Sequence, residues 1–319
     1  MLGHFTGVLI ESVSDGSSSQ ESRWAMNFFS NLMGKSGRKL PRVDLAQRFE
    51  RLGPLGTGSM SEIFRARDKV RGQMVALKIL DIERLKELNN RFLGREKPTE
   101  GEIAFQLRHQ YIVKTFDFGI SPKGEEFLAM EIVEGAPLGR LIEAKSDRIH
   151  AKGLRYLIQI AEGLSYIHQQ GWIHRDICPR NILINMEDQV RLIDFGLMVP
   201  NTPDFQSPGN RTGTANYMAP ELLKRQRTDQ RIDIFSYSVT AYEMLSGRRP
   251  WEAGQSLDKM MSLINQPPLD IREAVPGLPD GLAEIIMKGL QKPPDDRWQT
   301  MGDVVKALHQ FKVQQNRGR

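Results

Sequence analysis

The chain has 319 residues, of which 39% are hydrophobic and 26% charged, and its formal net charge is +5. This length suffices for one large domain or two packed lobes, and the spread of apolar residues along the chain is typical of a soluble globular protein. No stretch approaches the roughly 18 apolar residues that span a bilayer, and no charged start leads into an apolar core, so the sequence predicts neither a membrane helix nor a secretory signal.

The single cysteine, Cys178, excludes an internal disulfide framework and a cysteine-based zinc site, and it indicates a reducing cytoplasm. The basic charge balance does not by itself predict nucleic-acid binding, because acidic and basic residues alternate nearly everywhere. One small basic cluster, at Lys35, Arg38, Lys39 and Arg42, has no interleaved aromatic residues for base stacking. We interpret this cluster as a solvated linker and expect no nucleic-acid partner.

Residues 1–47 are expected to form an N-terminal extension that is partly disordered. The Ser/Gly-rich run at 14–19 buries too little apolar surface to order itself. Residues 24–33 are apolar on most sides, so this short segment either docks on the main domain or lies on a membrane surface. Its length leaves both interpretations open.

From about residue 48 the pattern changes to short strands with turns between them. The expected strands are 49–55, 62–66, 74–80 and 125–133, with a polar, helix-favouring stretch at 82–107. After Gly153 the apolar residues recur at three- and four-residue steps, which predicts helices at 154–168, 231–246, 280–290 and 301–312. The expected fold class is α+β. A small strand-rich N-lobe with one main helix (about 48–132) precedes a larger helical C-lobe (about 135–312) and a tail (313–319).

Gly56 and Gly58 lie in a turn between the first two expected strands. Without a Cβ, such a backbone can close over phosphates and turn its N–H groups toward the anion. The segment lacks the Gly-Lys-Ser/Thr ending of a Walker loop, and a strand follows it instead of a helix. Lys78 ends the next apolar strand, where pairing with the glycine hairpin would bring its ammonium to bound phosphates.

A second cluster comprises residues 174–181 (HRDICPRN) and 191–196 (RLIDFG). Phosphoryl transfer requires an acceptor hydroxyl held in line and a divalent metal that offsets the charge of the phosphates. Magnesium takes hard oxygen ligands, often only one or two of them from protein. Asn181 and Asp194 can supply these oxygens, and Asp176 can orient the hydroxyl and accept its proton.

In this order and spacing the motifs resemble those of the eukaryotic-type protein kinase family over about residues 48–312. The resemblance is strongest to serine/threonine kinases, and the segment 213–221 is similar to that of bacterial members. It implies the bilobal protein kinase fold, ATP and Mg²⁺ as cofactors with Mn²⁺ as an alternative, and a protein substrate of unidentified kind. It also allows a transient dimer for autophosphorylation.

The resemblance also assigns roles to residues. Asp176 matches the catalytic base, Asn181 and Asp194 the metal ligands, and Lys78 the lysine that pairs with phosphates. The ATP-binding positions that it implies lie in the glycine loop, the strands, the main N-lobe helix and the hinge: Leu55, Gly56, Thr57, Gly58, Ser59, Ile63, Ala76, Lys78, Glu100, Met130, Glu131 and Ile132. Glu96 and Glu102 compete with Glu100 as the helix glutamate that pairs with Lys78. The positions of structural importance are Glu221, Asp233 and Arg297.

Four positions depart from the family pattern. Ser61 replaces the third loop glycine, Ser238 replaces a helix-packing glycine, and Cys178 replaces the lysine that follows the catalytic aspartate by two residues. We hypothesise that Arg180 steadies the transferred phosphate in place of that lysine. Thr214 favours serine/threonine over tyrosine specificity, because tyrosine kinases tend to have a proline there.

The fourth departing position, Asn210, lies in the activation segment, residues 194–221. Arg175, before the catalytic aspartate, is typical of kinases whose segment is ordered by phosphorylation. The position four residues before Thr214 is Asn210, which has no hydroxyl, so Ser207 and Thr212 are the phosphosite candidates and Thr202 is a weaker one.

Two alternatives to a protein kinase remain. A pseudokinase scaffold would bind nucleotide without transfer, although every residue that the chemistry needs is present. A small-molecule phosphotransferase generally lacks the Ala-Pro-Glu ending found here at 219–221.

Overall fold

The computed structural model describes residues 40–58, 61–90, 95, 97–208, 211–251 and 264–317. The expected disordered run, the apolar segment 24–33, Ser59 and Glu96 lie outside the described residues. The described chain begins beside the edge of the N-lobe sheet, where Arg42 and Ile120 form an isolated parallel bridge. A one-turn helix, α2 (Leu45–Arg48), follows, and the Asp44 side chain caps it.

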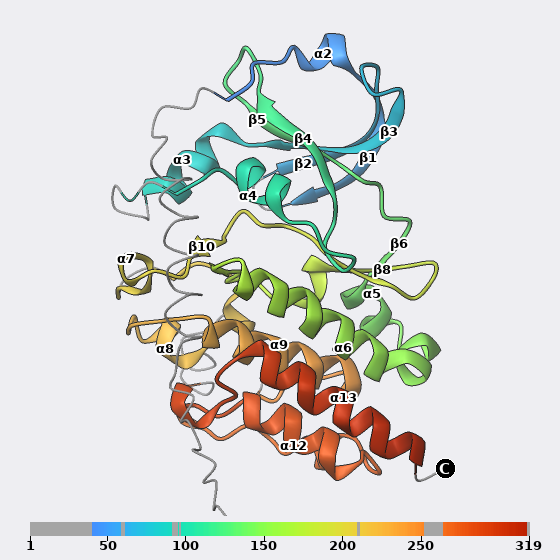
Figure 1. Cartoon of the computed structure of the whole chain (residues 1–319), viewed down its shortest axis with the longest axis vertical. Coiled ribbons are helices and arrows are strands. Elements are labelled where there is room, and N and C mark those ends of the chain that lie inside the picture. Colours follow the sequence, from blue (N-terminus) through green and yellow to red (C-terminus); the bar gives the residue numbers. More distant parts are fainter. Residues whose placement is uncertain are drawn as a thin grey trace, which may run out of the picture. The chain divides into compact units, whose positions relative to one another are not determined.

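The N-lobe is built on a five-stranded antiparallel sheet with the strand order β1-β2-β3-β5-β4 (Figure 1). The strands are β1 (Phe49–Gly58), β2 (Ser61–Asp68), β3 (Gln73–Leu80), β4 (Thr115–Ile120) and β5 (Glu126–Met130). Four of the five lie where the apolar runs predicted them. The sequence analysis did not predict β4, which carries Asp117 and Gly119 within six residues and lies at the edge of the sheet.

One face of this sheet carries the N-lobe core. Leu77 at the centre of β3 and Phe127 of β5 are fully buried, and the ring of Phe49 meets that of Phe127 edge-on at 5.6 Å between centroids. The burial of six consecutive residues at the end of β3 explains why this strand has a continuous apolar run. Its lysine, Lys78, is therefore held in a fixed position in the sheet.

The polar stretch 82–107 contains two separate helices, α3 (Ile82–Asn90) and α4 (Glu100–Gln106). A new helix begins at α4 because Thr99 forms a capping box: its hydroxyl accepts the Glu102 N–H, and the Glu102 carboxylate accepts the Thr99 N–H. The cap fixes where Glu100 stands.

The C-lobe is helical and lies below the sheet in Figure 1. Its described helices are α5 (Leu138–Glu143), α6 (Asp147–Gln169), α7 (Pro203–Gln206), α8 (Pro220–Leu223), α9 (Arg231–Ser246), α11 (Ile271–Ala274), α12 (Asp280–Gly289) and α13 (Met301–Arg317). The expected division into a strand-rich N-lobe and a helical C-lobe is confirmed. Helix α6 begins earlier than predicted, because the Ser146 side chain caps it, and α13 continues through most of the expected tail.

Short strands at the top of the C-lobe position the candidate site. β6 (Gly135–Pro137), β8 (Ile182–Asn185) and β9 (Val190–Leu192) form one small sheet, and β7 (Trp172–Ile173) pairs with β10 (Val199–Pro200). Residues 174–181 connect β7 to β8, and residues 193–198 connect β9 to β10. Each of the two chemistry-bearing loops therefore connects the same two small sheets, β7–β10 and β6–β8–β9.

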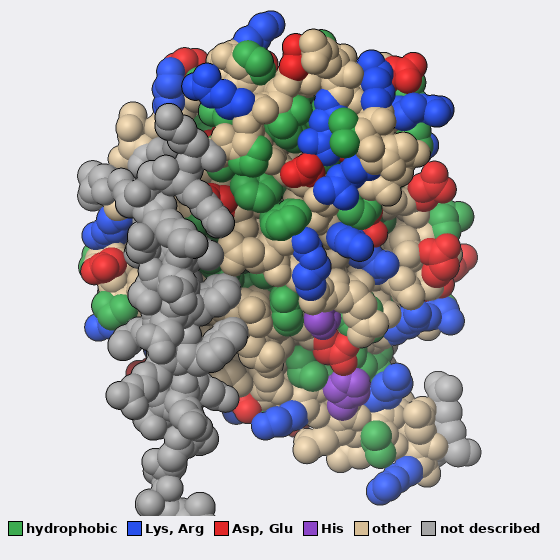
Figure 2. Space-filling view, turned by 45° about the horizontal axis from the view of Figure 1, so that its top comes forward, with side chains coloured by type: hydrophobic (Ala, Val, Ile, Leu, Met, Phe, Trp, Pro, Cys, Tyr) green, Lys and Arg blue, Asp and Glu red, His purple; other side chains and the backbone are tan. Residues whose placement is uncertain are grey.

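The surface charge is mixed. On the face shown in Figure 2, Lys and Arg side chains are interspersed with Asp and Glu side chains and do not gather in one patch. This agrees with the alternation of charges along the sequence.

Candidate active site

Lys78 of β3 lies between two carboxylates from distant parts of the chain. Its Nζ donates to Glu100 Oε1 at 2.6 Å and to Asp194 Oδ1 at 3.0 Å. Glu100 is therefore the helix glutamate that reaches Lys78, whereas Glu102 is engaged in the cap of α4. These contacts join the sheet, α4 and the loop after β9 at one point.

The charges at this point support one another. Burial opposes a charge on Lys78, but the Asp194 and Glu100 carboxylates raise its pKa above the ordinary value. Burial likewise opposes ionisation of Asp194, but the ammonium of Lys78 lowers the pKa of that carboxyl. Burial raises the pKa of Glu100, so its negative charge depends on the neighbouring ammonium. The lysine is thus a fixed cation at the top of the candidate site.

Asp176 lies in the loop between β7 and β8 and is held on both sides. Its Oδ1 accepts the Thr214 hydroxyl at 2.6 Å and the Thr214 N–H at 2.8 Å. Its Oδ2 accepts the Asn181 amide at 2.8 Å and the Arg180 guanidinium at 3.2 Å. Four donors thus fix the carboxylate that the sequence singled out as the base.

Asp233, at the start of α9, holds the backbone of this loop by hydrogen bonds. Its carboxylate accepts the backbone N–H groups of His174 and Arg175 at 2.7 and 2.8 Å, and it lies 2.9 Å from His168 Nε2. Burial works against its ionisation, but the bond with His168 keeps its pKa lowered. Arg175 has a positive φ of 70°, a strained backbone that these contacts stabilise.

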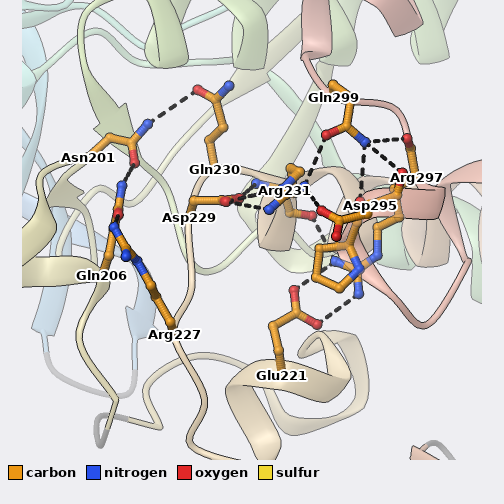
Figure 3. A network of polar contacts seen from close by, with 11 residues as sticks. Asn201, Gln206, Glu221, Arg227, Asp229, Gln230, Arg231, Asp295, Arg297 and Gln299 are labelled. Atoms are coloured by element: carbon orange, nitrogen blue, oxygen red, sulfur yellow. Dashed lines mark hydrogen bonds and ion pairs between the residues drawn. The ribbon is translucent and has the colours of Figure 1, made fainter.

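Glu221 and Arg297 form a buried two-pronged ion pair. Each terminal guanidinium nitrogen lies 2.7 Å from a different carboxylate oxygen of Glu221 (Figure 3). Beside it Arg231 pairs with Asp229 at 2.8 Å and with Asp295 at 2.7 Å. The end of the activation segment is thereby attached to α9 and to the segment before α13.

The expected nucleotide-binding residues lie along the sheet and in the connection that follows it. Ile63 is opposite Lys78, and Ala76 is opposite Met130 in the strand pairing. The N–H of Glu131 donates to a backbone carbonyl at 2.9 Å, so this N–H is not available to a purine edge. Ile132 is partly buried just beyond it.

The glycine loop is described only in part. Gly56, Thr57 and Gly58 pair with the start of β2, Leu55 is 46% exposed, and Ser59 lies outside the described residues. Ser61 is buried and paired with Leu80, so serine is accommodated where the family pattern has glycine.

The side chains of Asn181 and Asp194 offer hard oxygen donors of the type that Mg²⁺ prefers. Asp194 remains 39% exposed, so its carboxylate is accessible from the site. Among the described residues, no cluster of three or more His, Cys, Asp or Glu side chains is arranged to hold a metal ion. The residues present fit a divalent cation that takes few ligands from protein.

Cys178 is buried against Thr214, with its sulfur 3.7 Å from the threonine hydroxyl oxygen. Burial raises the pKa of its thiol to about 12, so Cys178 stays a neutral thiol. Even when ionised a thiol is an anion, so Cys178 cannot supply the positive charge of the missing lysine. The guanidinium beside Asp176 comes from Arg180 instead, and 59% of that side chain is exposed.

The candidate phosphosites differ in accessibility. Ser207 is partly exposed, and its hydroxyl donates to the Pro203 carbonyl at 3.2 Å. Thr212 is buried, and its hydroxyl has no hydrogen-bond partner in the described part of the chain, as is also the case for Thr202. In this conformation Ser207 is the more accessible of the two principal candidates.

Sequence reasoning missed one polar group at the site, Lys97. Its Nζ donates to the backbone carbonyls of Gly196 at 2.7 Å and Met198 at 3.3 Å. A lysine in a polar stretch before a helix carries no pattern that distinguishes it from a solvated residue, so only the structure could reveal this contact.

Comparison with known proteins identifies the family. The family model "Protein kinase domain" matches residues 49–310. The chain belongs to the protein kinase family. Serine/threonine-protein kinase PknH of Mycobacterium bovis is 32% identical over 258 residues, which cover 80% of this chain and 42% of that protein.

Two further bacterial relatives extend this result. Serine/threonine-protein kinase PknE of Mycobacterium tuberculosis is 32% identical over 260 residues, covering 80% of this chain and 44% of that kinase. The probable serine/threonine-protein kinase CPE1738 of Clostridium perfringens is 29% identical over 273 residues, covering 85% and 39%. The matches therefore span less than half the length of these kinases. Within the described residues, no helix is both long enough and apolar enough to cross a membrane.

Proposed function

We propose that this chain transfers the γ-phosphoryl group of ATP to a serine or threonine hydroxyl of a protein substrate. The observation that carries the proposal is the Asp176 carboxylate, held by Thr214 and Asn181 while Lys78 is paired with Glu100 and Asp194. The names of the three relatives, all serine/threonine-protein kinases, support the same activity.

Each residue then has a role in the transfer. Asp176 orients the acceptor hydroxyl and accepts its proton, and Lys78 pairs with the phosphates of ATP. Asn181 and Asp194 would hold Mg²⁺, with Mn²⁺ as an alternative, and the metal would offset the negative charge of the phosphates.

One contact supports the assignment to serine and threonine, and a second bears on the transferred phosphate. The Thr214 hydroxyl donates to Asp176 beside the place where a small acceptor would lie. Arg180 directs its guanidinium to the same carboxylate, so it is placed to steady the transferred phosphate where Cys178 replaces the usual lysine.

Regulation through the activation segment is also proposed. Phosphorylation of Ser207 or Thr212 would bring a dianion into the segment that ends at Glu221, and Arg175 is the expected partner. Because Thr212 is buried, its modification would require the segment to open first. A transient dimer would supply one copy as the substrate of the other.

The domain limits remain proposals too. We assign residues 48–312 to the kinase domain and 1–47 to an extension, and we retain the cytoplasm as the proposed location.

A kinase assay with MgATP and a generic basic protein tests the proposal. The wild-type chain should yield phosphoserine or phosphothreonine, and Asp176→Asn should lower kcat by about 10²- to 10⁴-fold, as loss of a general base does. Asp147→Asn, an exposed carboxylate at the start of α6 and outside the activation segment, is the matched control and should retain activity.

Other results would favour the alternatives. ATP binding with no transfer by the wild-type chain would support a pseudokinase scaffold, and transfer only to small molecules would support a phosphotransferase. Mass spectrometry of the ATP-treated protein checks the phosphosites; absence of phosphate on residues 197–214 would exclude autoactivation through this loop.

A further inference from the structure

The lysine that sequence reasoning missed connects two elements of the site. Lys97 lies two residues before Thr99, the N-cap of α4, and donates to the carbonyls of Gly196 and Met198. In Figure 1 α4 lies above the segment that leads into β10. One side chain therefore joins the start of α4 to the backbone that directly follows Asp194.

Glu100 contacts the same stretch of backbone, but as a hydrogen-bond acceptor, whereas Lys97 is a donor. The Phe195 N–H donates to Glu100 Oε1 at 3.4 Å, and a Cβ on Gly196 would come within 3.1 Å of Glu100 Oε2. Near the start of α4, the Lys97 ammonium thus donates to two carbonyls of residues 195–198, and the Glu100 carboxylate accepts an N–H of the same short segment. Glu100 is also the partner of Lys78, so the segment and the phosphate-pairing lysine share one helix.

Lys97 is not an ordinary solvated lysine. Burial lowers its pKa to about 8, while the Glu100 carboxylate opposes that shift. By contrast, Lys86 of α3 is 64% exposed and pairs with Glu83 on the surface. The structure keeps an ammonium in a partly buried place where it has two carbonyl acceptors.

Helix α4 depends on such contacts. It has only seven residues, too few for a helix that is stable by itself in water. On its other side Gly101 packs closely against Phe118 of β4. Its position is therefore set by that packing and by the contacts at its N-terminal end.

We propose that Lys97 is a positioning residue that couples the placement of α4 to the conformation of residues 196–198, and so keeps Glu100 on Lys78. When residues 196–198 move away, Lys97 loses two acceptors and α4 loses an anchor. The pair between Lys78 and Glu100 then weakens. The inference rests on the proposed function. It adds that the conformation of residues 196–198 affects the ion pair between Lys78 and Glu100 in the same site.

A double-mutant cycle with Glu100→Gln tests this coupling. Lys97→Met should lower kcat/KM by about tenfold in the wild-type background, because two hydrogen bonds of a charged donor are lost. In the Glu100→Gln background the same change should cost less than about twofold, because Lys97 acts through Glu100. Lys97→Arg, which retains a cationic donor, should recover most of the activity.

The affinity for MgATP is measured in all variants by a direct binding assay. This readout requires no transfer, so it tests the coupling even if the proposed activity fails, and it should show the same non-additivity. Lys86→Met is the control and should match wild type, and thermal unfolding of each variant shows that it is folded. Equal losses in both backgrounds, or no loss in the wild-type background, would overturn the proposal.

Discussion

At the residue scale, we propose that one cation at the site stands in for another. The family pattern has a lysine where this chain has Cys178, and the high pKa of that thiol leaves it neutral. Arg180 is four residues beyond Asp176 and lies 3.2 Å from its carboxylate. A guanidinium spreads its charge over five N–H donors, so it can contact a phosphate and a carboxylate together.

Arg180→Ala should therefore lower kcat by about 10- to 100-fold, since a hydrogen bond to a charged group contributes about 1.5–3 kcal/mol. Arg180→Lys should retain part of the activity, because the charge remains but the two-sided geometry does not. Steady-state kinetics at saturating ATP gives both values. The control is Arg155→Ala, which changes an exposed arginine of α6. Full activity of Arg180→Ala with an unchanged fold would refute the substitution hypothesis.

At the scale of elements, helices α9 and α12 make a close contact in which α9 contributes Ser238 and α12 contributes a glycine. Ser238 of α9 is buried, and its hydroxyl donates to the Ile234 carbonyl one turn earlier at 2.9 Å. A Cβ added to Gly289 of α12 would overlap the Ser238 hydroxyl and lie 2.9 Å from its Cβ. The glycine that the family pattern places in α9 is thus absent, and the glycine that lets the two helices approach lies in α12.

Gly289→Ala should then destabilise the fold by about 1–3 kcal/mol, the usual cost of overfilling a packed core. The double variant Gly289→Ala with Ser238→Gly should regain most of this loss, because it only moves the glycine to the other helix. Urea unfolding measures both. Gly302→Ala in α13, where a Cβ meets nothing closer than 3.5 Å, should be neutral or stabilising. If the double variant is as unstable as the sum of its single changes, this account of the contact is wrong.

The same contact shows why the sequence predicted some features and not others. The apolar run of β3 and the period of α12 are local signals, and both elements lie where they were predicted. The motif residues Asp176 and Asp194 have fixed spacings, so they could be recognised without a structure. Gly289 and Lys97 act only through residues about 50 and 100 positions away, and no local pattern records such a contact.

At the scale of the whole molecule, stability should depend on pH through a buried carboxyl group. Glu126, at the start of β5, is partly buried. Burial, with the negative charges of Glu100 and Glu102, raises its pKa to about 7, although the cation of Lys97 acts in the other direction. The folded state therefore binds a proton at Glu126 more tightly than the unfolded chain does. Its contribution to stability is complete below pH 4.5 and is lost as the pH rises through 7.

Glu126→Gln keeps the shape of the neutral carboxyl and removes the titration. The variant should be about as stable as wild type near pH 5, and more stable by about 2 kcal/mol at pH 8, a value that allows for the partial exposure of the group. Urea unfolding at intervals between these pH values gives the difference curve. Glu83→Gln, which changes an exposed carboxylate of α3, should show the same pH dependence of unfolding free energy as wild type.

The difference in unfolding free energy between wild type and Glu126→Gln is more informative than the pH dependence of either protein alone. Burial lowers the pKa of His174, so that group favours the folded state more as the pH rises, with the opposite sign to Glu126. Lys97, whose pKa is lowered to about 8, acts like His174 above that pH. The contribution of His174 is present in wild type and variant alike and cancels in the difference. The contribution of Lys97 cancels only in part, because the Glu126 charge raises the pKa of Lys97 and the variant lacks that charge. A constant difference from pH 5 to 8 would therefore mean that Glu126 is already ionised throughout, and that the acidic side chains around α4 are better solvated than their burial indicates.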